Sequence, residues 1–245
     1  MGCVLKRVST FLLALYTLFS VLIIIGMGPL YLHFIATMVY MVIVFLGIVY
    51  AYTIRGSLPA ILGIWVVAFV FEYFGVKYCI PFGCYTYTDS LGVKVAGVPL
   101  VVVFMWCAIG YSAYALVYNL VEKRLARVFA TATLLTVVDL VLDPPLSTVG
   151  LWIWLEDHWI SFYGVPLSNF LGWLVLGLVV GYVYSSLRGG ARSRFLVYYS
   201  TTLFLLQLTL LNIKLEYVAP SVVGFILVVF SAVQTYSATR EEGFL

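Results

Sequence analysis

Long apolar stretches alternate with short polar ones along almost the whole chain. Eight of the apolar stretches are close to 20 residues long, about the length of an α-helix that crosses a bilayer. They cover residues 9–27, 33–53, 58–75, 98–121, 127–143, 168–187, 195–213 and 218–236. The pattern therefore predicts an all-α polytopic membrane protein, in which residues 1–245 form a single transmembrane domain.

The composition narrows the possible functions. Of the 245 residues, 64% are hydrophobic and 9% are charged, whereas soluble domains carry about 25% charged residues. A soluble globule of this size needs more polar surface than the chain supplies, which excludes a soluble enzyme. The net charge of +3 is too small for a phosphate backbone, so we expect no nucleic-acid partner. With only two histidines, we also expect no metal site built from histidines.

Basic residues are distributed unevenly between the two ends of the predicted spans. Ten lie at one end, and three, Lys77, Lys94 and Lys214, lie at the other. Because cytoplasmic loops carry the excess of basic residues, we expect both termini in the cytoplasm and the loops 76–97 and 144–167 outside. Cys79 and Cys84 lie in the first of these loops, where a disulfide is permitted; the sequence leaves their pairing open.

The two outer loops resemble each other. Gly97-Val98-Pro99-Leu100 precedes Trp106, and Gly164-Val165-Pro166-Leu167 precedes Trp173, with an offset of 67 residues in both cases. The same offset relates three further pairs: Glu72 and Asp139, Tyr85 and Trp152, Tyr87 and Trp154. The repeat predicts that residues 58–124 and 125–191 are two parallel copies of one unit, with a pseudo-twofold axis along the membrane normal.

The predicted copies differ in their polar residues. The second copy has Asp143 where the first has Val76, and Asn169 where the first has Val102. Polar groups within a membrane are costly and tend to be functional. Together with Glu72 and Asp139, these residues place three carboxyl groups and an amide at one depth.

The spacing and burial of these carboxyl groups point to acid–base chemistry. Asp139 and Asp143 share one helix face through their i, i+4 spacing, and Pro144-Pro145 is expected to end that helix. Because clustered carboxylates in an apolar site repel one another, we expect at least one to be protonated at neutral pH. Such a cluster suits general acid–base catalysis. The alternative is a structural network that caps broken helices or pairs with tyrosines.

Aromatic residues surround this cluster. Trp and Tyr are common at membrane interfaces, and residues 151–163 are predicted to form an interfacial helix. Trp106 and Trp173 lie deeper, two turns into their helices, where their ring faces could stabilise a cation. With Tyr85, Tyr87 and Trp154, they are the candidate substrate-binding residues.

Three other classes of membrane protein share some of these features. A light-driven rhodopsin needs a lysine midway along a late span, but Lys214 stands at the end of one. A prenyltransferase has two Asp-rich motifs with basic residues nearby, and only Asp139-x-x-x-Asp143 resembles one. A proton-coupled transporter would also use buried carboxylates and stays open.

Five segments carry a resemblance to a known family. They are Glu72-Tyr73-Phe74-Gly75-Val76, Pro81-Phe82-Gly83-Cys84-Tyr85-Thr86-Tyr87-Thr88-Asp89, Gly97-Val98-Pro99-Leu100, Asp139-Leu140-Val141-Leu142-Asp143-Pro144, and Tyr163-Gly164-Val165-Pro166-Leu167-Ser168-Asn169-Phe170-Leu171-Gly172-Trp173. Over residues 72–173, these segments make the chain similar to the CruF-type carotenoid biosynthesis proteins. The resemblance implies a membrane hydratase that adds water to the terminal double bond of an acyclic carotenoid ψ-end, in a substrate such as lycopene, γ-carotene or a C50 bacterioruberin precursor.

The implied reaction assigns a role to each candidate residue. Asp139 or Asp143 would be the acid, and Glu72 or the other aspartate the base. Asn169 would orient the water, Trp106 and Trp173 would shelter the carbocation, and the carotenoid would enter from the membrane lipid. The implied reaction requires no cofactor and no metal. Alternatives are a carotenoid cyclase or isomerase that uses the same acid site, and a non-catalytic pigment or lipid carrier. The sequence leaves the oligomeric state open.

Overall fold

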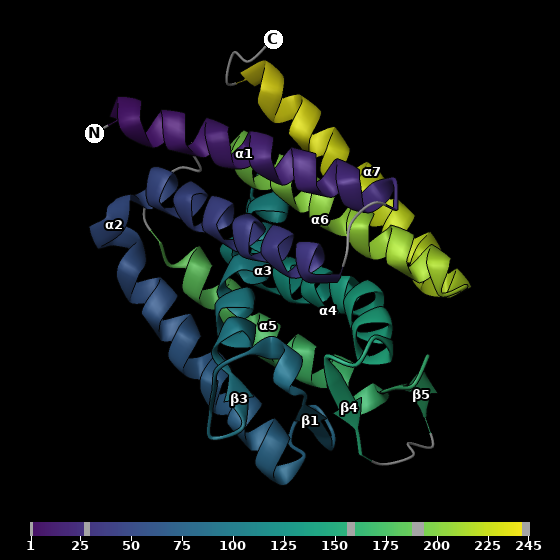
Figure 1. The fold of residues 1–245 in the computed structure, drawn as a ribbon. Helices are drawn as coiled ribbons and strands as arrows, with labels where there is room; N and C mark the ends of the chain where they lie inside the picture. Colours follow the sequence, from purple (N-terminus) through teal and green to yellow (C-terminus); the bar gives the residue numbers. More distant parts are fainter. Residues whose placement is uncertain (1, 27–29, 156–159, 188–193, 242–245) are drawn as a thin grey trace.

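The computed structural model describes residues 2–26, 30–155, 160–187 and 194–241 and is largely helical (Figure 1). Within these ranges, seven helices are long and apolar enough to cross a membrane. Their bounds are α1 Gly2–Ile24, α2 Leu30–Tyr78, α3 Leu100–Tyr118, α4 Arg124–Thr148, α5 Leu167–Ser185, α6 Arg194–Lys214 and α7 Val218–Glu241. The predicted all-α polytopic membrane fold is confirmed.

Helix α2 supplies two of the eight predicted spans. Its 49 residues would form a straight helix of about 75 Å, more than twice the thickness of a hydrocarbon core of about 30 Å. At Thr53 the backbone leaves the helical region, with φ 64° and ψ 162°, and α2 folds back on itself (Figure 1). The first arm, residues 30–52, and the second arm, residues 54–78, match the predicted spans 33–53 and 58–75.

Three short two-stranded ribbons lie at one end of the bundle. They pair β1 Tyr85–Tyr87 with β4 Trp152–Trp154, β2 Lys94–Val95 with β3 Val98–Pro99, and β5 Ser161–Phe162 with β6 Val165–Pro166. A short 3-10 helix, η1, spans Asp89–Leu91. The interfacial helix expected over residues 151–163 is wrong where the structure describes this segment, because β4 and β5 occupy it. Alternating aromatic and β-branched residues in Trp152–Trp154 favour a strand.

Equivalent elements recur at the 67-residue offset found in the sequence. β1 and β4, β2 and β5, β3 and β6, and α3 and α5 each begin 67 residues apart and have equal lengths. In the antiparallel pair β1–β4, Thr86 lies opposite Ile153, its own equivalent, so the pairing is symmetric about this point. On these equal offsets we base the proposal that residues 58–124 and 125–191 are two copies of one unit.

Helix α4 continues past the two prolines that were expected to end it, and reaches Thr148. A proline inside a helix cannot donate to the carbonyl four residues earlier, so Pro145 leaves the carbonyl of Val141 without its helical partner. Asn212 of α6 replaces that partner: its Nδ2 donates to the Val141 carbonyl at 2.8 Å. Asp143 therefore lies within a continuous helix.

Close packing of α4 against α5 positions the amide of Asn169. A Cβ added at Gly177 would lie 2.9 Å from the Cα of Ala132, and one added at Gly181 would lie 2.9 Å from the carbonyl oxygen of Val128. Because only glycine permits this approach, α5 lies directly against the backbone of α4. The contact places Asn169, in the first turn of α5, opposite the aspartates of α4.

Candidate functional site: a carboxyl cluster in an aromatic cavity

Glu72, on the second arm of α2, accepts three hydrogen bonds. Its Oε2 accepts from the hydroxyls of Tyr85 at 2.6 Å and Tyr87 at 2.7 Å, and its Oε1 accepts from Trp106 Nε1 at 2.7 Å. An indole N–H can only donate, and a carboxylate that receives several donors is stabilised in its charged form. This arrangement suits a fixed negative charge.

The tyrosines that bind Glu72 come from strand β1. Burial, followed by the charge of Glu72, raises the pKa of Tyr85 and Tyr87 well above the usual value, so both phenols remain donors at neutral pH. Gly75 makes room for this contact, because a Cβ there would lie 2.5 Å from the Tyr85 hydroxyl oxygen. A glycine one turn after Glu72 thus lets the ribbon reach the carboxylate.

Asp139 and Asp143 share a single amide donor. Asn169 Nδ2 donates to Asp139 Oδ2 at 2.7 Å and also to Asp143 Oδ2. Among the described residues, Asp139 Oδ1 has no hydrogen-bond partner, and neither aspartate forms an ion pair. Both side chains are buried. Two carboxyls this close repel each other as anions, so the arrangement suits a pair that holds a proton between them.

A cavity of about 680 Å³ connects the two parts of the cluster. Glu72, Asp143 and Asn169 line it, whereas Asp139 is fully buried behind Asp143. The rings of Trp106 and Trp173 meet at this wall, with centroids 4.1 Å apart and planes inclined by 39°. A substrate in the cavity would therefore contact one aspartate, one glutamate, one amide and two indole rings.

The structure brings together every candidate site residue that the sequence singled out. Glu72, Asp143 and Asn169 lie on the cavity wall with five aromatic candidates, Tyr85, Tyr87, Trp106, Trp154 and Trp173. Asp139 joins them through Asn169. Tyr85 and Tyr87 also hold Glu72, which is the pairing of a carboxyl with tyrosines that the sequence left open as the structural alternative.

Phe82 and Gln207 are among the wall residues that sequence reasoning missed. Phe82 lies against Trp106, with centroids 6.3 Å apart, and occupies the space that a Cβ at Gly172 would need, 2.5 Å from its ring. Gln207 lines the cavity from α6 and donates to Ser20 Oγ at 2.7 Å. Phe82 lies in a segment already quoted for the family resemblance, and a lone amide within an apolar run could have signalled Gln207.

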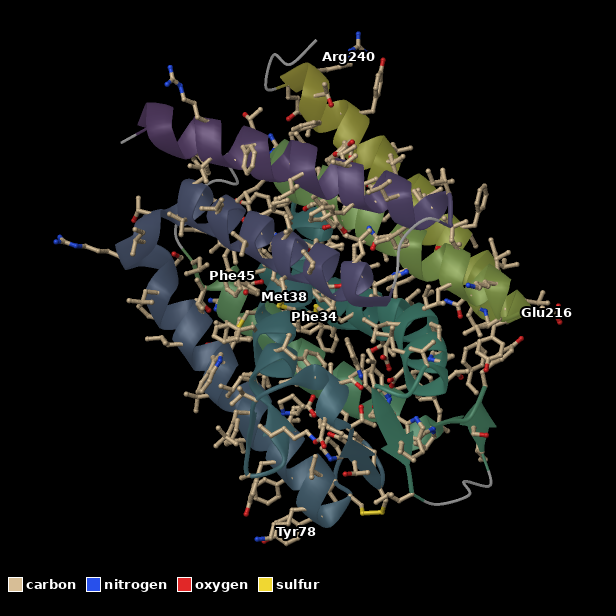
Figure 2. The ribbon with its side chains drawn as sticks, in the orientation of Figure 1. Phe34, Met38, Phe45, Tyr78, Glu216 and Arg240 are labelled. Atoms are coloured by element: carbon tan, nitrogen blue, oxygen red, sulfur yellow. A yellow bond between two sulfur atoms is a disulfide. The ribbon has the colours of Figure 1, made fainter. Side chains whose placement is uncertain are left out.

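A disulfide joins Cys79 and Cys84 in the turn that leads into β1, drawn as the yellow bond in Figure 2. The sequence had left this pairing open. Of the described cysteines, Cys107 is free and buried. No three His, Cys, Asp or Glu side chains in the described ranges are grouped as metal ligands would be.

Comparisons with known proteins give one family and one curated relative. The family model described as "Carotenoid biosynthesis protein" matches residues 27–231. A protein named bisanhydrobacterioruberin hydratase, from Haloarcula japonica, is 37% identical over 113 residues. That alignment covers 44% of this chain and 38% of the relative, so the chain spans well under half of that protein. No solved structure matches the chain.

Proposed function

The chain belongs to the carotenoid biosynthesis protein family, and from that membership we propose that it adds water to the terminal double bond of an acyclic carotenoid, giving a tertiary alcohol. The relative's name supports hydration as the reaction and a bacterioruberin precursor as one substrate. Lycopene and γ-carotene are the other substrates that we propose. The observation that carries the proposal is the Asp139–Asp143 pair, which shares one amide at the wall of an aromatic cavity.

The first step is protonation of the alkene. Asp143, the aspartate that lines the cavity, transfers its proton to the CH carbon of the terminal double bond. The π electrons form the new C–H bond and leave a tertiary carbocation on the dimethyl carbon. Asp143 becomes a carboxylate beside the cation, and Trp106 and Trp173 offer their ring faces to it.

The second step is capture by water. A water oxygen donates a lone pair to the carbocation, and the resulting oxonium group returns one proton to Asp143. The tertiary alcohol is formed and the acid is restored, so the overall change is the addition of one water. General acid–base catalysis of this kind contributes about 10²- to 10⁴-fold to a rate.

The other polar residues act on these steps from fixed positions. Asp139 is behind the wall and shares the amide of Asn169, so we assign it the role of holding the proton of the pair near Asp143. Glu72 is held by three donors, and we assign it the role of a fixed charge that stabilises the cation. Asn169 orients the pair and the water.

We also propose that the ribbon end of the bundle, with the site, faces outward and that both termini are cytoplasmic. The excess of basic residues at the opposite end supports this orientation. The Cys79–Cys84 disulfide at the ribbon end also supports it, because disulfides persist in oxidising surroundings.

The test is expression in a host that makes lycopene and in one that makes bisanhydrobacterioruberin, with pigments analysed by liquid chromatography and mass spectrometry. The wild type is compared with Asp143→Asn and with a matched control, Asp89→Asn. Asp89 is an exposed carboxylate that pairs with Lys94 at 2.8 Å. We expect a pigment heavier by one water in wild type and Asp89→Asn, and its loss in Asp143→Asn at equal protein level.

The other outcomes separate the alternatives. A new pigment of unchanged mass would indicate a cyclase or isomerase that uses the same site. An unaltered pigment pool in both hosts would contradict the proposed hydration. Hydration that persists in Asp143→Asn would contradict the role given to that residue.

A further inference from the structure

The cavity at the acid site is smaller than the substrate it is proposed to hold. A pocket of about 680 Å³ is of the size that encloses a drug-sized ligand, whereas a carotenoid is a much longer molecule. The end group and the first part of the polyene fit inside, and the rest of the chain must leave the cavity. Its path is limited by the walls that are closed.

The floor of the cavity is closed. Phe204 of α6 lines it and stacks on Tyr40 of α2, with ring centroids 4.6 Å apart and planes inclined by 4°. Ile109 of α3 lies beside them and is also buried. Tyr40 is held in turn by a hydrogen bond with Ser112 at 2.9 Å. A straight polyene therefore has no way down through the centre of the bundle.

The wall formed by α4 and α5 is closed as well. Gly177 and Gly181 bring α5 against the backbone of α4, so no gap separates these helices. The Asp139–Asn169–Asp143 hydrogen bonds join the same two helices at the level of the cavity.

The seam between the first arm of α2 and α3 is open toward the lipid. Phe34 lines the cavity and is also 43% exposed. Met38, Val101 and Met105 line the same side and are half-buried. Figure 2 shows Phe34 and Met38 close together on the first arm of α2. All four side chains are apolar, and methionine adapts its shape to what it contacts.

The same seam closes a few turns further along the arm. Phe45 packs edge-on against Phe104 of α3, with ring centroids 6.2 Å apart, and Trp65 of the second arm covers Phe104 from the other side at 6.2 Å. On this seam, the opening therefore ends before Phe45.

We propose that the polyene of the carotenoid leaves the cavity sideways through this opening, framed by Phe34, Met38, Val101 and Met105, and continues into the lipid. The inference rests on the proposed function, since it takes a carotenoid as the occupant. It adds the path of the chain and the residues that contact the polyene outside the acid site.

The test is photo-crosslinking in a carotenoid-producing host. Benzoylphenylalanine replaces Phe34 in one variant and Val42 in a matched control on the same arm, which is 46% exposed and does not line the cavity. A second pair uses Met38 and Phe45. Folding is checked by size-exclusion chromatography, and the adduct is detected by the visible absorption of the polyene on the purified protein and by mass spectrometry.

We expect the adduct at Phe34 to exceed that at Val42 several-fold, and the adduct at Met38 to exceed that at Phe45. Equal yields within both pairs would overturn the proposed path. Hydration is measured in wild-type cells of the same host. Adducts at the opening without hydration would remove the proposed activity and keep the path, whereas hydration with equal adduct yields would remove the path alone.

Discussion

In the proposed repeat, Glu72 and Asp139 are equivalent positions, 67 residues apart, yet different hydrogen-bond donors surround them. Glu72 receives two phenol hydroxyls and one indole N–H. Asp139 accepts one hydrogen bond, from the Asn169 amide that also donates to Asp143. Its other carboxyl oxygen has no hydrogen-bond partner among the described residues. From this difference we propose that Glu72 serves as a fixed charge and Asp139 as part of a pair that holds a proton, according to the donors around each.

The sequence differences behind this contrast are few. Tyr85 and Tyr87 of the first copy are Trp152 and Trp154 in the second, so the hydroxyl donors are absent there. Val76 and Val102 of the first copy are Asp143 and Asn169 in the second, which adds a second carboxyl and the shared amide. The two halves should therefore respond differently to substitution.

The largest effect is expected when the second copy is made like the first. Asp143→Val places the residue of the first copy at this position and removes the proposed proton donor. We expect hydration to fall by about 10²- to 10⁴-fold without loss of folded protein, because a carboxyl that has little compensation is removed. Product yield per amount of protein measures it, and turnover within threefold of wild type would show that Asp143 is not the acid.

Glu72→Gln should differ by lowering stability as well as turnover. Three donors converge on a charged acceptor, and hydrogen bonds to charged groups contribute about 1.5–3 kcal/mol each. An amide accepts more weakly and adds donors of its own, so we expect a loss of at least about 2 kcal/mol in stability. Thermal unfolding in detergent, compared with Asp143→Asn, measures the contrast. Equal thermal stability of Glu72→Gln and Asp143→Asn would contradict the proposed difference between a charged Glu72 and a protonated aspartate pair.

Fluorination of Trp106 should give an intermediate effect. Each fluorine weakens the negative potential of the ring face, and a cation–π contact contributes about 0.5–2 kcal/mol. We expect hydration to fall stepwise with the number of fluorines, by about tenfold in all. Trp65, which lies outside the cavity lining, is the matched position. If hydration depended on the number of fluorines at Trp106 no more than at Trp65, the Trp106 indole would contribute its shape alone.

The smallest effect is expected at Asn212, which supports the second copy from α6. Asn212→Leu leaves the carbonyl of Val141 without its donor, at a cost of about 1–3 kcal/mol. The Val141 carbonyl needs this donor because Pro145 has no N–H to offer it. The first copy has Tyr78 at the position equivalent to Pro145. A modest drop in thermal stability with hydration reduced only a few-fold is the expected result, and unchanged stability would show that this bond is dispensable.

The sequence predicted the spans, the 67-residue offset and the members of the carboxyl cluster, because hydropathy and polar residues inside spans are local signals. It failed at Pro144-Pro145, where the helix continues because a side chain from α6 replaces a lost donor. It also failed over residues 151–163, where pairing of Trp152–Trp154 with β1 outweighs a helical interpretation. Both failures depend on contacts between distant segments.

The roles of the three carboxyls could not be predicted from the sequence, because they also depend on contacts between distant segments. The positions of Glu72, Asp139 and Asp143 in the predicted spans put them at one depth but do not show which hydrogen-bond donors each carboxyl receives. Tyr85 reaches Glu72 because Gly75 leaves space for it. Asn169 reaches both aspartates because α5 lies against α4. Phe82 and Gln207 join the wall through packing that no motif reports.

We propose that the Asp139–Asp143 pair holds a proton at neutral pH and that Glu72 carries a fixed negative charge. Infrared spectroscopy of the purified protein in lipid tests it directly, since a protonated carboxyl has its own C=O stretching band. We predict such a band in the wild type that is lost or shifted in Asp143→Asn and in Asp139→Asn, and retained in Glu72→Gln. A band that disappears in Glu72→Gln and is unchanged in both aspartate variants would contradict the account.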